Sequence, residues 1–82
     1  MILVDIYVPS IDKTYNFQLN ETIVNKVVIE EVAEMISHKE QVVVWGEISG
    51  LVLCHQEQKK ILPQNSSLQQ CGVRNGSRLI LV

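Results

Sequence analysis

The chain has 82 residues, of which 46% are hydrophobic, and its formal net charge at pH 7 is −2. One hydrophobic core fits this length, so we expect a single domain over residues 1–82 with no space for an enclosed substrate pocket. The lack of a Lys/Arg cluster beyond Lys59-Lys60 argues against nucleic acid as a partner, and no apolar run approaches the ~20 residues needed for membrane insertion.

The first twenty residues show two segments in which apolar side chains occupy every second position. Such alternation predicts strands with one face on a core. Pro9-Ser10 and Asp12-Lys13 lie between the two segments and predict a turn, so we expect a hairpin. The expected inward positions are Ile2, Val4, Ile6, Val8, Tyr15, Phe17 and Leu19.

A helix is expected to follow the hairpin, with Thr22 as its N-cap because a threonine hydroxyl can accept a backbone N–H of the first turn. Lys26, Glu30 and Glu34 fall on the side of the helix that should face water. The opposite side carries apolar residues at spacings of three and four, which predicts a buried stripe made of Val24, Val27, Val28, Val32, Met35 and Ile36.

The second half of the chain predicts short elements joined by turns. Val42–Trp45 fits a short strand or a loop, and the flanking glycines favour the loop. We expect strands at 51–54 and 60–62, a polar turn at 55–58 between them, and a final strand at 78–82. A single helical turn at 68–71, closed by Gly72, and a tight turn at Asn75-Gly76 should precede the final strand.

This order of elements predicts an α+β fold in which a mixed sheet of four to five strands packs on one main helix. A single apolar stripe on the helix requires one sheet face to cover it. The first and last strands are apolar on both sides, which fits the centre of the sheet. We therefore expect a β-grasp arrangement with these two strands parallel and adjacent.

Three segments resemble ubiquitin. Thr22–Val27 is similar to the opening of its helix, Leu51–Cys54 to its third strand, and Leu68–Leu81 to its closing turn and strand. The closing stretch Cys71–Leu79 more specifically resembles the YukD/EsaB family, small ubiquitin-like proteins encoded with type VII (WXG100) secretion systems of Gram-positive bacteria. Residues 37–50 do not align, so nothing is carried over to them.

The family resemblance implies a cytoplasmic, non-enzymatic accessory protein that binds a component of the secretion machinery. The sequence ends at Val82 without the Gly-Gly carboxylate that ubiquitin-type conjugation uses, so we expect binding without covalent attachment. The alternative is a sulfur or protein carrier with an activated C-terminus, and a further one is a ubiquitin-like interaction module of another bacterial system.

The candidate metal ligands and nucleophiles are His38, Cys54, His55 and Cys71. None has the paired spacing of a zinc site, and adjacent Cys54 and His55 would point to opposite faces of a strand. We therefore expect no metal, cofactor or catalytic residue, and structural roles for both cysteines. Two cysteines are also too few for a disulfide-stapled secreted domain.

The predicted functional feature is one face of the sheet. If Leu79 and Leu81 enter the core, Ile80 and Val82 must point the other way, and the same argument places Val52 outside. We expect Val52, Ile80 and Val82 to form a protein-binding patch, although scattered exposed aliphatic residues are common. Trp45 is either a buried anchor or an exposed contact, and in the second case it would be a further protein-binding residue.

Overall fold

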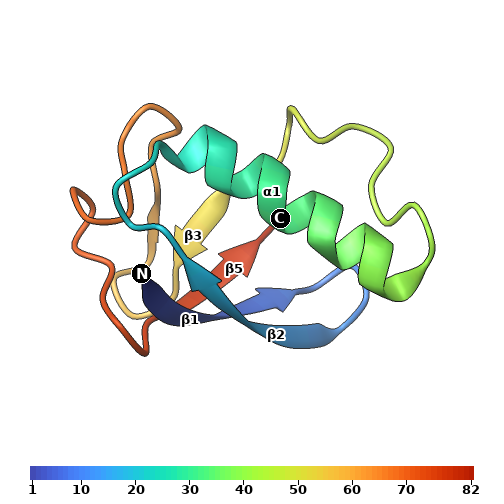
Figure 1. Cartoon of the computed structure of the whole chain (residues 1–82), viewed down its shortest axis with the longest axis horizontal. Coiled ribbons are helices and arrows are strands. Elements are labelled where there is room, and N and C mark those ends of the chain that lie inside the picture. The colour runs from blue at the N-terminus through green and yellow to red at the C-terminus, as the bar shows by residue number, and fades with distance from the viewer.

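The computed structural model describes every residue, 1–82, and shows one sheet with one helix across it (Figure 1). The elements are β1 (Ile2–Val8), β2 (Lys13–Leu19), α1 (Asn25–Glu40), β3 (Leu53–His55), β4 (Lys60–Ile61) and β5 (Arg78–Leu81). The strands lie in the order β2-β1-β5-β3-β4. Only the β1–β5 pair is parallel. The predicted β-grasp fold is therefore confirmed.

The core lies between α1 and the sheet face that α1 covers. The even-numbered residues Val4, Ile6 and Val8 of β1 are fully buried there, beside Leu79 and Leu81 of β5. The β1–β2 hairpin turns at Asp12, which adopts a left-handed conformation with φ of 51°. The alternation of apolar residues in the sequence thus predicts correctly which side chains of the first and last strands face the core.

The helix begins two residues later than the Thr22 cap predicts, because its N-cap is Val24. Thr22 instead donates its backbone N–H and its hydroxyl to Asn20 Oδ1, at 2.9 and 2.6 Å, so it belongs to the preceding turn. Val24 holds the N-cap position and supplies no side-chain hydrogen bond. Backbone carbonyls of a distant loop serve as caps, because Asn25 and Lys26 donate their N–H groups to Ser66 and Gln64.

The buried side of α1 is also rotated relative to the predicted stripe. Val24, Val27 and Met35 are exposed by 41%, 38% and 44%. Val27 and Met35 lie in one row along the helix with Glu31, whose carboxylate favours water on that side. The rows on the opposite side of the helix carry no charge and face the sheet. The buried residues of the helix are Asn25, Val28, Ile29, Val32, Ala33 and Ile36.

The segment after the helix is a loop, as the sequence favoured for Val42–Trp45. Helix α1 ends with Gln41 in a left-handed conformation, and regular structure resumes only at β3. The predicted strand at 51–54 therefore starts two residues late and includes His55. His55 is buried, contrary to its predicted place in a polar turn, because it pairs with Leu79 on the inner face.

The predicted turns before β5 are present. Cys71 donates its N–H to Ser67, which closes one helical turn, and Gly72 follows with a positive φ of 75°. Gly76 has a φ of 88° in the next turn, a conformation that side chains disfavour. None of the helical structure is long and apolar enough to cross a bilayer.

Candidate functional site

The sheet face opposite α1 carries no helix, and its strand register brings apolar side chains together (Figure 1). Residues that face each other across a strand pair lie on the same side of a sheet. Cys54 faces Ile61 on one side and Ile80 on the other. Because Leu53 and His55 are buried inside, Cys54 and both of its partners lie on the outer face.

A second apolar pair lies beside the first, just past the ends of β3 and β5. Val52 donates its N–H to the Val82 carbonyl at 2.8 Å, and Val82 returns a hydrogen bond to Val52 at 3.1 Å. The two valines are thus directly opposed and share the outer face with Ile80. The structure therefore brings Val52, Ile80 and Val82 together.

We define the outer-face patch as Val52, Cys54, Ile61, Ile80 and Val82. Ile61 and Val82 are 66% and 48% exposed, and the other three side chains are partly exposed. Neither Ile61 nor Cys54 was predicted as a member. Leu62 is buried, so strict alternation would have placed Ile61 outside had β4 been long enough to show a pattern.

Trp45 does not belong to this patch. It is half-buried in the loop after α1 and packs against the core cluster, which lies on the helix side of the sheet. The same loop holds Val42 and Val43, which are 58% and 84% exposed. The four predicted binding residues are therefore divided between two separate parts of the surface.

Polar residues border the outer-face patch on its β1 side. Tyr7 lies next to Ile80 across the parallel pair, and Asp5 lies next to Arg78. These four residues contribute to the lining of a shallow open pocket. Tyr7 donates its hydroxyl to Asp12 at 2.8 Å, and this hydrogen bond to the carboxylate raises the Tyr7 pKa above its usual value of 10.0.

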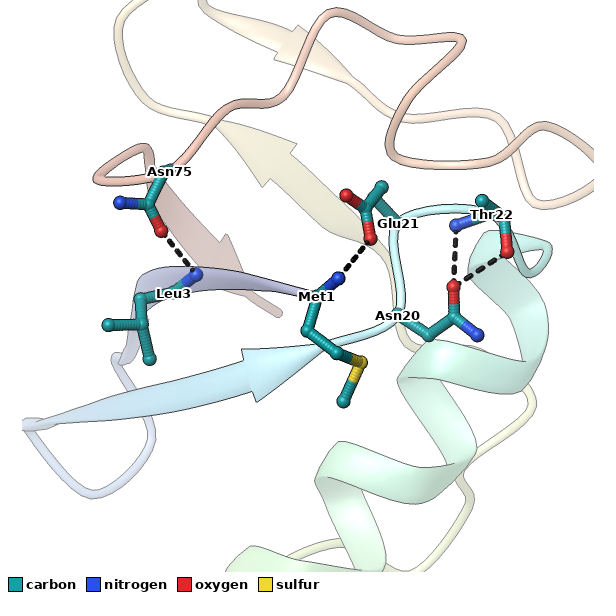
Figure 2. A network of polar contacts seen from close by, with 6 residues as sticks. All are labelled: Met1, Leu3, Asn20, Glu21, Thr22 and Asn75. Carbon is teal, nitrogen blue, oxygen red and sulfur yellow. Dashed lines mark hydrogen bonds and ion pairs between the residues drawn. The ribbon is translucent and has the colours of Figure 1, made fainter.

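The start of β1 is held by a network of polar contacts at one end of the sheet (Figure 2). The Met1 ammonium lies 2.9 Å from Glu21 Oε1 and lowers the pKa of that carboxyl. Leu3 donates its N–H to Asn75 Oδ1 at 2.8 Å, and its carbonyl accepts the Gly76 N–H at 2.7 Å. The two Leu3 contacts join β1 to the turn that leads into β5, and so help to fix the register that builds the outer face.

The end of α1 is joined to β2 by side chains. Glu40 accepts hydrogen bonds from Tyr15 and, at 2.8 Å, from Lys13. The Lys13 ammonium and the Tyr15 hydroxyl lower the Glu40 pKa. Burial, followed by the bond to Glu40, raises the Tyr15 pKa to about 12. The Lys39 ammonium lies 5.4 Å from the centre of the Tyr15 ring.

The two cysteines are free and lie in different parts of the structure. Cys54 belongs to the outer-face patch, whereas Cys71 contacts the helix start, where Asn25 Nδ2 lies 3.6 Å from its sulfur. Asn25 is fully buried and also donates to the Pro63 carbonyl at 2.8 Å. No group of three or more His, Cys, Asp or Glu side chains is close enough to hold a metal ion.

Many solved structures share this fold. The EccD5 ubiquitin-like domain of Mycobacterium xenopi is 23% identical, with a TM-score of 0.77 over 99% of this chain and 91% of that domain. The ubiquitin-like domain of the Mycobacterium tuberculosis type VII secretion protein EccD1 is 18% identical, with a TM-score of 0.69 over 100% and 99%. Ubiquitin of Caldiarchaeum subterraneum is 14% identical, with a TM-score of 0.72 over 98% and 89%.

The sequence match is more specific than these structural likenesses. No curated protein sequence matches the chain. Residues 3–81 match the family model described as "WXG100 protein secretion system (Wss), protein YukD". That range includes every strand, the helix and the closing segment whose resemblance to this family the sequence had indicated. The chain is therefore a ubiquitin-like member of the YukD family of the WXG100, or type VII, protein secretion system.

Proposed function

We propose that this protein is a non-enzymatic cytoplasmic adaptor that binds a component of the type VII secretion machinery through its outer-face patch. The observation that carries the proposal is the patch itself. Five apolar side chains, Val52, Cys54, Ile61, Ile80 and Val82, share a sheet face that no other element covers. Because the chain belongs to the YukD family, we expect the partner among the components of the type VII secretion system.

The composition of the patch suits a folded protein partner. Protein interfaces commonly have an apolar centre with few charges and a polar rim that remains wet. Here the aliphatic residues form the centre, and Asp5, Arg78 and Tyr7 form one side of the rim. Ile80 lies in the middle of the register row, with Cys54 on one side and Tyr7 on the other. We therefore expect Ile80 to contribute most to binding.

The test is capture of secretion components by the tagged protein from its native host. Ile80→Asp should remain folded and should weaken capture at least about tenfold, the effect typical of a central interface residue. Val52→Asp should have the same direction of effect. Val27→Asp is the matched control, because Val27 is an aliphatic residue of α1 that is 38% exposed and lies on the other side of the sheet from the patch. Equal capture by Ile80→Asp and wild type would reject the patch as the binding surface.

Trp45 is proposed as a second contact, through the part of its ring that remains exposed. Trp45→Phe preserves an aromatic side chain against the core, so the fold should be retained. A loss of capture by this variant at unchanged thermal stability would support a contact. Unchanged capture would mean that Trp45 packs against the core and does not contact the partner.

The proposed binding is non-covalent. Denaturing gels of host lysate, probed for this chain, should show only the free 9.3 kDa species. A ladder of heavier adducts that resists thiols would contradict this and favour the carrier function. An acyl-adenylate exchange assay with the host's activating enzymes provides the independent readout, and product in that assay would revive the carrier alternative.

A further inference from the structure

The two edges of the sheet differ in how they are protected against further strand pairing. An open edge is a template for another strand unless it is short, charged, bulged or interrupted by proline. The β4 edge has only two residues, Lys60 and Ile61, with Lys59 before them and Pro63 soon after. The β2 edge has seven residues, a single charged one at Lys13, and no proline. Only the β4 edge is protected.

The hydrogen-bond register shows which backbone groups the β2 edge presents. Asp5 donates its N–H to Ser77 at 3.0 Å, and Leu3 accepts from Gly76, so the odd-numbered residues of β1 point toward β5. Their partners in β2 therefore form non-hydrogen-bonded pairs with β1. These partners are Gln18, Asn16 and Thr14, opposite Leu3, Asp5 and Tyr7. Their N–H and C=O groups point to the open edge.

We propose that β2 pairs with β2 of a second copy of this chain, antiparallel and centred on Asn16. In this register Asn16 faces Asn16, and Thr14 of one copy faces Gln18 of the other. The backbone N–H and C=O groups of all three residues point to the open edge, so both hydrogen bonds of each of these pairs can form. The residue at the centre is uncharged, and no like charges face each other, because Lys13 of one copy lies opposite Leu19 of the other.

Side chains on the helix side favour the same register. Tyr15 of one copy would face Phe17 of the other in a non-hydrogen-bonded pair, where side chains approach most closely. Phe17 is only partly buried and lies 6.1 Å from the Tyr15 ring of its own chain, measured between ring centres. The second copy would extend this aromatic pair into a cluster of four rings, and aromatic cross-strand pairs stabilise sheets. A strand from another protein would need aromatic residues at the positions opposite Tyr15 and Phe17, whereas a second copy of this chain has them there by symmetry.

The test is sedimentation of the full chain over a range of concentrations, with matched variants of Gln18. Gln18→Pro removes an N–H that points away from β1, so it leaves the internal ladder intact while blocking both symmetry-related bonds to the second copy. Gln18→Thr keeps the N–H and is the control. We expect wild type and Gln18→Thr to dimerise with similar dissociation constants, and Gln18→Pro to raise that constant at least about tenfold.

Amide hydrogen exchange supplies a readout that locates the contact. The amides of Thr14, Asn16 and Gln18 should be protected at high protein concentration and should exchange rapidly in dilute solution. A monomer at every concentration with rapid exchange of these amides would overturn the proposal. A dimer that persists in Gln18→Pro but is lost in Ile80→Asp would overturn it in favour of the outer face. Protection that appears only when another protein is added would replace the second copy by a foreign strand.

Discussion

The two faces of the same central strands have opposite surroundings. Leu53, Leu79 and Leu81 lie on the inner face at 0% exposure, beneath α1. Their immediate neighbours Cys54, Ile80 and Val82 lie on the outer face, which no element covers. Both sets of residues are apolar, so hydrophobicity alone does not separate them. The difference shows that position in the two-residue repeat decides whether an aliphatic side chain stabilises this fold or remains available to a partner.

Leu81→Asp tests the inner face and should have the largest effect. A carboxylate without a partner would be buried beside β1 and α1, at a cost of several kcal/mol. This cost is comparable with the whole stability of a small domain, ~5–15 kcal/mol, so the variant should be unfolded or nearly so. Circular dichroism and thermal melting measure the outcome.

Ile80→Asp is the control for this comparison, because it makes the same chemical change one residue away. Its carboxylate should remain in water, so the variant should melt close to the wild-type temperature. If Ile80→Asp unfolds and Leu81→Asp does not, the faces are assigned the wrong way round and the binding proposal fails with them.

Asn25→Ala tests the one amide side chain buried on the inner side. Asn25 Nδ2 donates to the Pro63 carbonyl and joins the start of α1 to the loop that caps it. Removing a buried hydrogen-bond partner costs about 1–3 kcal/mol, so we expect a loss of stability in that range. Asn25 Oδ1 is buried without a partner, which lowers the cost of removing the amide. Urea unfolding measures the change, and an unaltered midpoint would show that the amide does not hold the helix in place.

Three of the five residues of the outer-face patch, Val52, Ile80 and Val82, could be placed on one face from the sequence because alternation is a local property. Residues 2–8 and 78–82 each show the alternation over enough positions to predict the fold, the side chains that face the core and the central position of these two strands in the sheet. The start of α1 was not predictable in the same way. Its first N–H groups bind carbonyls of Ser66 and Gln64, about forty residues away in sequence, so the local cap candidate Thr22 was misleading.

The rotation of the helix face and the burial of His55 were missed for different reasons. Glu31 lies in the row of Val27 and Met35, and a greater weight on that charge would have selected the row of Ile29 and Ala33. His55 gave no signal of this kind. A polar residue followed by polar residues reads as a turn, and only the pairing with Leu79 across the sheet places it inside.

Replacing the two cysteines compares the outer face with the partly buried site at the start of α1, and the changes in stability should be smaller. Cys54→Val enlarges an aliphatic patch on the outer face and should change stability by no more than ~0.5 kcal/mol. Cys71→Ala removes a partly buried sulfur that contacts the buried Asn25, and should cost of order 1 kcal/mol. Chemical denaturation of both single variants and the double variant gives the comparison. Stoichiometric zinc in the wild type, lost in the double variant, would contradict a structural role.

Glu40→Gln tests whether the join between α1 and β2 depends on charge, and should have the smallest effect. The Glu40 pKa is lowered in the folded protein by Lys13 and Tyr15, from a usual value of 4.5. A lowered pKa means that the unfolded chain binds the proton more readily, so this stabilisation is present above pH 4.5 and is lost as the pH falls through the folded-state value. Glu40→Gln should therefore be less stable than wild type at pH 7, and the difference should shrink at pH 3. Urea unfolding of both proteins at the two pH values measures this. A difference that stays constant between them would show that the Glu40 carboxylate acts by shape and hydrogen bonding alone, and that its charge adds nothing to the attachment of the helix end.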